Sequence, residues 1–155
     1  MTFEFGNPHL RIREPQEPKF TVSARVRRNL RSRSVHVCGD WHLWIYFCDW
    51  VVYEGKRVVG DKMTHRRVDR AAAFLNGQKL VGVEIRPRGT RCRFEFDLGG
   101  VLETKPYDRT SEQWMLFTPD GMVLTVRAGG KYSFMRGDEP EDNKVWRSIP
   151  AAVAG

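Results

Sequence analysis

The run of apolar residues from 41 to 53, WHLWIYFCDWVVY, constrains the fold of this chain more than any other segment. Both alternate sets of side chains in the run are apolar, so a strand built from it is hydrophobic on each face. Strands of that kind are typical of the middle of a structure. We therefore expect residues 41–53 to form a central strand whose aromatic side chains belong to the core.

Other short segments show the two-residue period of a half-buried strand, and they recur about every ten residues. Turn signals separate them, among them Gly99-Gly100, Pro119-Asp120-Gly121 and Gly129-Gly130. This arrangement predicts an antiparallel meander that forms a curved sheet or an open barrel. The further strands that we predict are 20–27, 35–38, 58–59, 80–85, 92–98, 101–104, 113–117, 122–127 and 131–134.

One helix is predicted over residues 65–75. Thr64 can act as its N-cap, and Asn76-Gly77 supplies a left-handed stop. Apolar side chains recur within it at helical spacing, so we expect one side to pack on the sheet. The fold class that follows is α+β, mainly β.

Both ends of the chain are predicted to be tails. Residues 1–19 are interrupted by Pro8, Pro15 and Pro18, which disfavour a regular element. Residues 137–155 are polar and then rich in small residues, although Trp146 and Ile149 would pin this segment to the rest. Between them, residues 20–136 are expected to form a single mainly β domain, because no linker or repeat divides them.

The cysteines and the hydropathy pattern predict a cytoplasmic protein. Cys38, Cys48 and Cys92 are odd in number and contain no CxxC pair, so we expect buried thiols rather than disulfides. No apolar run approaches the ~20 residues of a membrane-spanning helix, and the first residues lack the pattern of a secretory signal. We expect no contact with a membrane.

Positive charge is concentrated in the first half of the chain. The net charge is +7, and residues 20–93 contain sixteen basic and six acidic residues. Arginine is the more frequent basic residue and binds carboxylates and phosphates in a bidentate manner. This excess of positive charge has two interpretations: it binds an anionic partner, or it only keeps the protein soluble.

The second half of the sequence resembles a group of small uncharacterised bacterial proteins. The similarity rests on GDWHLWIYFCDW (39–50), LNGQ (75–78), FDLGGVLETKPYD (96–108) and EQWMLFTPDGMVLTVRAGGKYSF (112–134). It covers about residues 36–135 and implies a bacterial origin and one compact domain. The shared residues are apolar or turn-forming, so the resemblance assigns no activity and no site.

Residues that could carry chemistry form no recognised motif. His36, Cys38, His42 and Cys48 are possible zinc ligands, but their spacing matches no compact chelating hairpin. Asp49 interrupts an apolar strand and requires a partner if it is buried. We expect no metal and no cofactor, and an enzyme that uses Asp49 or His42 is only the second alternative function.

The sequence favours a non-catalytic module that binds another protein, in the manner of an immunity protein or an accessory partner. Tryptophan and arginine are the residues that anchor such interfaces, and the basic surface suits an acidic partner. Binding of nucleic acid or another polyanion through the same arginines is the first alternative. The predicted contact residues are Arg27, Arg28, Arg31, Arg33, Arg66 and Arg70.

Overall fold

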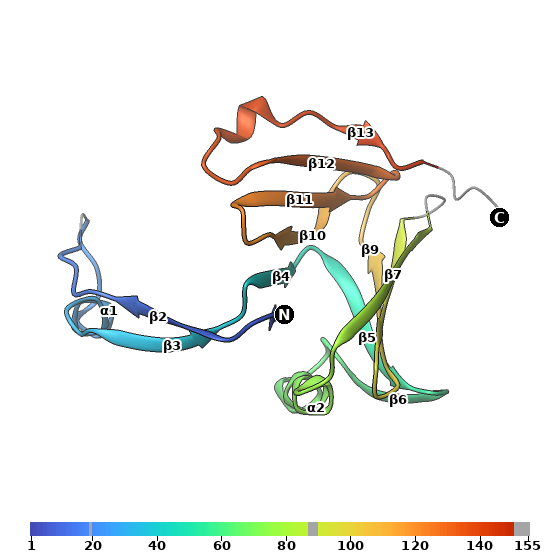
Figure 1. Ribbon diagram of the computed structural model, residues 1–155, viewed down its shortest axis with the longest axis horizontal. Helices are drawn as coiled ribbons and strands as arrows, with labels where there is room; N and C mark the ends of the chain where they lie inside the picture. Colours follow the sequence, from blue (N-terminus) through green and yellow to red (C-terminus); the bar gives the residue numbers. More distant parts are fainter. Residues whose placement is uncertain (19, 87–89, 151–155) are drawn as a thin grey trace.

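The computed structural model describes residues 1–18, 20–86 and 90–150. In this part of the chain two antiparallel sheets form a body, and a separate two-stranded ribbon projects from it (Figure 1). Two α-helices accompany the strands. The prediction of an α+β, mainly β fold is therefore confirmed.

The first sheet has six strands in the order β1-β4-β10-β11-β12-β13. Its second half is the predicted meander, since β10, β11 and β12 are consecutive and each pairs with the next. The strands are β1 (Thr2–Phe5), β4 (Trp41–Ile45), β10 (Glu112–Phe117), β11 (Met122–Arg127), β12 (Lys131–Arg136) and β13 (Arg147–Ser148).

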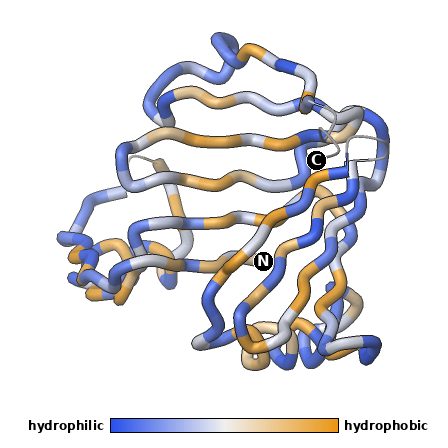
Figure 2. Tube along the Cα trace, turned by 45° about the vertical axis from the view of Figure 1, so that its right-hand side comes forward, coloured by the Kyte–Doolittle hydropathy of each residue, from blue (hydrophilic) through white to orange (hydrophobic). Residues whose placement is uncertain are grey.

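The second sheet has five strands in the order β6-β5-β9-β8-β7. Hydrophobic and hydrophilic residues alternate along many strands of both sheets, as Figure 2 shows. The strands are β5 (Cys48–Glu54), β6 (Arg57–Asp61), β7 (Leu80–Arg86), β8 (Arg91–Phe96) and β9 (Gly100–Pro106).

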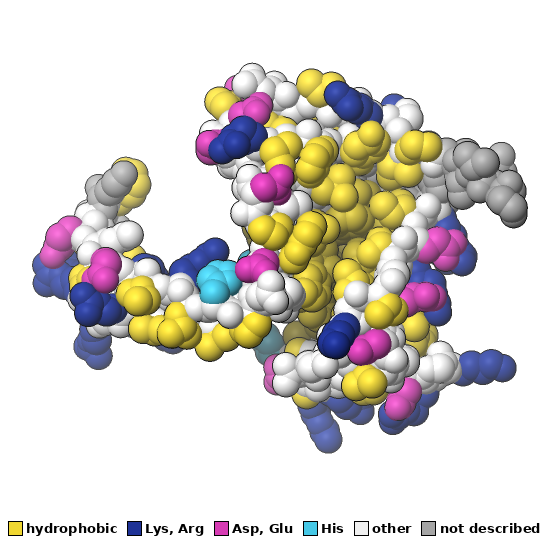
Figure 3. Space-filling view, viewed as in Figure 1, with side chains coloured by type: hydrophobic (Ala, Val, Ile, Leu, Met, Phe, Trp, Pro, Cys, Tyr) yellow, Lys and Arg dark blue, Asp and Glu magenta, His cyan; other side chains and the backbone are white. Residues whose placement is uncertain are grey.

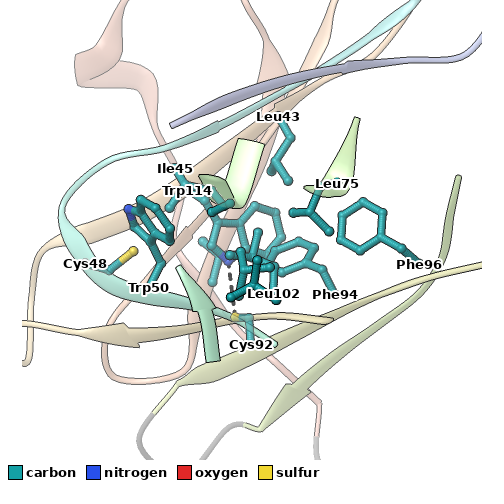
Figure 4. Packing of buried hydrophobic residues seen from close by; sticks show 14 residues of the cluster. Leu43, Ile45, Cys48, Trp50, Leu75, Cys92, Phe94, Phe96, Leu102 and Trp114 are labelled. Atoms are coloured by element: carbon teal, nitrogen blue, oxygen red, sulfur yellow. Dashed lines mark hydrogen bonds between the residues drawn. The ribbon is translucent and has the colours of Figure 1, made fainter. Parts of the chain in front are cut away.

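The two sheets share one hydrophobic core, and neither closes into a barrel within the described residues. They meet near β5, β9 and β10 and diverge toward β7 and β12 (Figure 1). At the junction the indole N–H of Trp114 donates a hydrogen bond to the sulfur of Cys92 over 3.2 Å, and Phe94 packs edge-on against the same indole (Figure 4). Trp114, Cys92 and Phe94 are all buried, so this contact joins the six-stranded sheet to the five-stranded one.

The run 41–53 is not one central strand, and this prediction is wrong. The chain leaves the first sheet after β4, and β5 starts the second sheet at Cys48. Because the direction changes at residues 46–47, the two apolar faces of the run do not stay on two faces of one sheet. Trp50 is buried as expected, whereas Trp41, Trp44 and Phe47 are exposed.

Helix α2 (His65–Leu75) agrees with the prediction in both its ends and its cap. The Thr64 hydroxyl accepts from the backbone N–H of Arg67, and Gly77 adopts the left-handed conformation after the helix. The helix lies so close to β6 that a Cβ atom at Gly60 would be 2.2 Å from the Arg67 carbonyl oxygen. Only glycine permits this approach, which seals one end of the core.

The N-terminal prediction is corrected in two places. Residues 2–5 form β1, and residues 9–13 form β2 (His9–Arg13), where the prolines predicted no regular element. Residues 20–27, predicted as a strand, contain instead the start of helix α1 (Ala24–Leu30). The Ser23 side chain accepts from the Val26 N–H, and this cap favours the helix over the apolar alternation.

The C-terminal segment returns to the body as its aromatic residue predicts. A 3₁₀ helix, η1 (Glu141–Asn143), precedes β13, and the guanidinium of Arg127 lies 4.2 Å from the ring centre of Trp146. Ile149 packs against the core. The segment therefore contacts the six-stranded sheet through Trp146 and reaches the core at Ile149.

Candidate functional site

The most distinctive surface of the molecule is a projecting arm, which we define as residues 9–38. It consists of β2, a loop, α1 and β3 (Ser34–Cys38), and it stands apart from both sheets in Figure 1. Residue 19 within it lies outside the described residues.

Contacts at the base fix where the arm leaves the body. The Asp40 carboxylate accepts from the backbone N–H of Asn7 over 3.1 Å, and its other oxygen lies 3.5 Å from Nδ1 of His9. A Cβ atom at Gly39 would lie 2.1 Å from the carbonyl oxygen of Phe5, so the chain crosses β1 at its closest point there. The start of the arm is therefore anchored, while the rest extends into solvent.

The β2–β3 ribbon has one apolar and one polar face. Leu10 is opposite Val37 and Ile12 is opposite Val35, so these four side chains share one face. Their exposed fractions are 64%, 71%, 57% and 55%, respectively. Figure 3 shows a strip of hydrophobic side chains along the lower side of the arm.

The polar face of the ribbon and its tip carry the arginines. Arg11 lies opposite His36, and Arg13 lies opposite Ser34. The Arg13 guanidinium donates to the carbonyl of Asn29, and the Gln16 N–H donates to the carbonyl of Leu30. These two bonds hold α1 across the end of the ribbon, and the apolar face stays uncovered.

Nearly all the net charge of the protein is on the arm. Its eight Lys and Arg residues and two Glu residues leave +6 of the total of +7. Two arginines are paired inside the arm: Arg31 with Glu17 at 3.1 Å and Arg33 with Glu14 at 2.8 Å. Within the described residues, the arginines of the arm that have no carboxylate partner are Arg11, Arg13, Arg25, Arg27 and Arg28.

The structure divides the predicted arginine surface into two patches. Arg27 and Arg28 are on α1, and Arg31 and Arg33 follow it within the arm. Arg66 and Arg70 are on α2, which lies against β6 at the lower end of the body, apart from the arm (Figure 1). The six arginines therefore lie on two separate elements, the arm and α2.

The possible zinc ligands are not assembled either. His42 Nδ1 is 2.7 Å from the Glu4 carboxylate, and the thiol of Cys48 is buried against the carbonyl of Gln113. His36 is on the polar face of the ribbon, and Cys38 is buried at its base. Among the residues that the structure describes, no group of three or more potential ligands converges.

Asp49 is a partly exposed surface carboxylate. It is paired with the ammonium group of Lys62, which also contacts Tyr107. His42 belongs to the six-stranded sheet, and its Nδ1 contacts the Glu4 carboxylate. The two residues of the enzyme alternative are thus on different sheets, each with its own partner.

Sequence reasoning missed the apolar face of the ribbon. The signal was present as two alternating patterns, Leu10-Arg11-Ile12 and Val35-His36-Val37. Their pairing across more than twenty residues of chain is what places the four apolar side chains together.

Comparison of this chain with protein-family models, with curated proteins and with solved structures yields no match. In the described part of the chain, no helix combines the length and the apolar character needed to cross a membrane.

Proposed function

We propose that this protein is a non-catalytic module that binds another protein through its arm. The observation that carries the proposal is the exposed apolar face of Leu10, Ile12, Val35 and Val37, on an arm whose arginines mostly have no carboxylate partner among the described residues. Contiguous apolar surface of this kind is typical of an interaction site.

The physical state of the ribbon supports binding. A two-stranded ribbon is at best marginally stable in water, and it becomes stable when a further strand or a helix covers its hydrophobic face. Complete burial of one Leu, Ile or Val side chain contributes about 1.5–3 kcal/mol. A partner that covers this face therefore supplies a layer that the described part of the chain does not.

The charge of the arm specifies the partner further. Arg25, Arg27 and Arg28 on α1 are exposed at the tip, beyond the apolar face. An apolar groove with an acidic rim complements this arrangement, since opposite charges steer the encounter and exclude wrong partners. We infer a protein with that surface as the partner.

Binding of nucleic acid is the second candidate, and the charge of the arm favours it. The arm, with its net charge of +6, is attracted to phosphates, and the major groove of DNA accommodates a two-stranded ribbon. This reading gives the apolar face no role, which is why we place it second.

Capture from a lysate of the source organism distinguishes the two. The bait is the wild-type chain or the double variant Leu10→Ser, Val37→Ser, and Leu98→Ser is the control because Leu98 is 72% exposed on the body. We expect one stoichiometric protein that survives nuclease and ~0.5 M salt, where the Debye length is only a few ångströms. The double variant loses it and the control retains it. Capture that nuclease abolishes supports the nucleic-acid candidate instead.

We also infer that the protein resides in a reducing compartment such as the cytoplasm. Its three cysteines are free and buried, as the sequence predicts. A chain of this kind needs no oxidising environment to fold. Subcellular fractionation followed by thiol titration tests the placement.

A further inference from the structure

A second apolar surface lies in the body, where the two sheets diverge. Figure 3 shows a hollow lined by hydrophobic side chains between the six-stranded sheet and β7. Near its β1 end is a pocket of about 540 Å³ whose apolar walls are Phe5, Trp41, Leu80 and Leu116. These residues come from β1, β4, β7 and β10, so both sheets contribute to the pocket.

The pocket is elongated rather than compact. An adjoining pocket of about 460 Å³ shares Glu4, Phe5, Gly77 and Gln78 with it and continues along β1 toward α2 and Phe96. Each volume is in the range of about 300–1,000 Å³ that is usual for small-molecule sites. An extended cleft made of two adjoining pockets suits a flexible chain better than a compact ring system.

The polar side chains around the pocket differ in whether they already have hydrogen-bond or ion-pair partners within the protein. The Glu4 carboxylate already accepts from Nδ1 of His42 and from the N–H of Gly39. The Gln78 amide donates to the carbonyl of Phe74 and accepts from the N–H of Gly100. Both side chains are therefore occupied within the protein.

Lys79 is the exception. Its backbone N–H donates to the Asp97 carboxylate and its carbonyl accepts from the Asp97 N–H, but no ion pair joins its ammonium group to any carboxylate of the described residues. Lys79 is thus an exposed lysine that lines a mostly apolar pocket and has no carboxylate partner among the described residues. A ligand that fills the pocket with hydrocarbon and ends in an anion satisfies both features.

We propose that this cleft binds an unbranched aliphatic carboxylate of the fatty-acid class. The hydrocarbon chain lies against Phe5, Leu80 and Leu116, and the carboxylate meets the ammonium group of Lys79. This site is separate from the arm and does not depend on the function proposed for it.

The test is calorimetric titration of the full chain with sodium dodecanoate below its micellar concentration. We expect 1:1 binding that Lys79→Gln weakens about two- to fivefold, the effect of one exposed charge pair. Lys105→Gln is the matched control, since Lys105 is an exposed lysine on β9 of the second sheet, and it leaves the affinity unchanged. Lys79→Arg restores binding because it retains the charge.

Leu116→Trp fills the pocket and abolishes binding, and circular dichroism checks that this variant is folded. If Leu116→Trp does not fold, Lys79→Gln still tests the proposal, because a substitution of an exposed side chain leaves the fold intact. The proposal is overturned if dodecanoate does not bind, or if Lys79→Gln binds as tightly as the wild type. Equal or tighter binding of dodecyltrimethylammonium also overturns it, because the occupied Glu4 would then be the anchoring group.

Discussion

Leu10 and Val37 face each other across the β2–β3 ribbon, and both are mostly exposed. Leu43 and Leu116 are opposite each other in the same way in the six-stranded sheet, but Leu43 is buried beneath the second sheet. The two pairs have similar apolar side chains and similar pairing, and they differ in what covers them. The arm is thus a sheet surface that no other described segment of the chain covers.

The first prediction concerns the ribbon in the free protein. Its backbone hydrogen bonds are protected by one neighbouring strand only, so they open with a small free energy. We expect the amides of residues 10–13 and 34–37 to exchange with deuterium much faster than those of β5 and β9. Hydrogen-exchange mass spectrometry measures this, and equal protection in the ribbon and in those central strands would contradict it.

The second prediction separates the arginines of the arm. Two double variants are compared: one carries Arg27→Gln and Arg28→Gln, and the other carries Arg31→Gln and Arg33→Gln. Both lower the net charge by the same amount, so a difference in their partner binding reports local contact. Arg31 and Arg33 are already paired with Glu17 and Glu14. We expect the Arg27, Arg28 variant to weaken partner binding roughly three- to tenfold at physiological salt, and the other clearly less. Surface plasmon resonance with the captured partner provides the comparison, and identical losses would argue against a contact at α1.

The third prediction concerns the joint between the sheets. Trp114→Phe removes the donor to the Cys92 sulfur and leaves a cavity among buried residues. We expect it to lower the free energy of unfolding by about 2–3 kcal/mol, which combines a cavity and a lost hydrogen bond. Trp44→Phe is the control, because Trp44 is exposed, and it should cost less than about 1 kcal/mol. Urea denaturation of both variants tests the difference.

The fourth prediction concerns stability at alkaline pH. Burial raises the pKa of the Cys48 thiol to about 12, from a usual value of 9.0. The folded state therefore keeps the proton that the unfolded state releases, so the stabilisation is complete below pH 9 and is lost as the pH rises toward 12. The expected slope for this thiol is about 1.4 kcal/mol per pH unit.

Two other groups act in the same direction at alkaline pH. Burial raises the pKa of Cys92, and burial together with a hydrogen bond to Glu112 raises the pKa of Tyr46. The Cys48→Ala variant isolates the contribution of Cys48, because its stability should fall less steeply between pH 9 and 12. A slope identical to that of the wild type would show that Cys48 ionises equally in both states.

Local signals in the sequence were sufficient for α2 and for the β10–β12 meander. Thr64 and Gly77 fix the ends of the helix within their own neighbourhood, and tight turns connect consecutive strands of the meander. The same reasoning failed for residues 20–27, where the Ser23 cap and the helix-forming residues after it outweigh an apparent strand alternation.

Pairing between distant segments could not be predicted. β2 lies between Pro8 and Pro15 and looks irregular by itself, and it becomes a strand because β3 supplies its hydrogen bonds. In the same way, the sequence near Tyr46 and Phe47 contains no turn signal, although the chain moves there from one sheet to the other.

The candidate site was predictable only in part. The clustering of arginine in residues 25–33 correctly indicated a local basic surface, and Arg27 and Arg28 remain without carboxylate partners in the described residues. Arg66 and Arg70 are on a different helix from Arg27 and Arg28, which a charge pattern could not indicate because it contains no information on how helices are placed. The pairing of Arg31 and Arg33 with glutamates of the same arm could be seen only in the folded chain.

The most direct test of the proposed function is hydrogen exchange of the arm with and without its captured partner. We predict that binding protects the amides of residues 9–13 and 34–38 strongly, with smaller changes in α1 and none in β9, which lies in the middle of the second sheet. Protection that appears elsewhere, with unchanged exchange in the ribbon, would contradict the assignment of the arm as the binding surface.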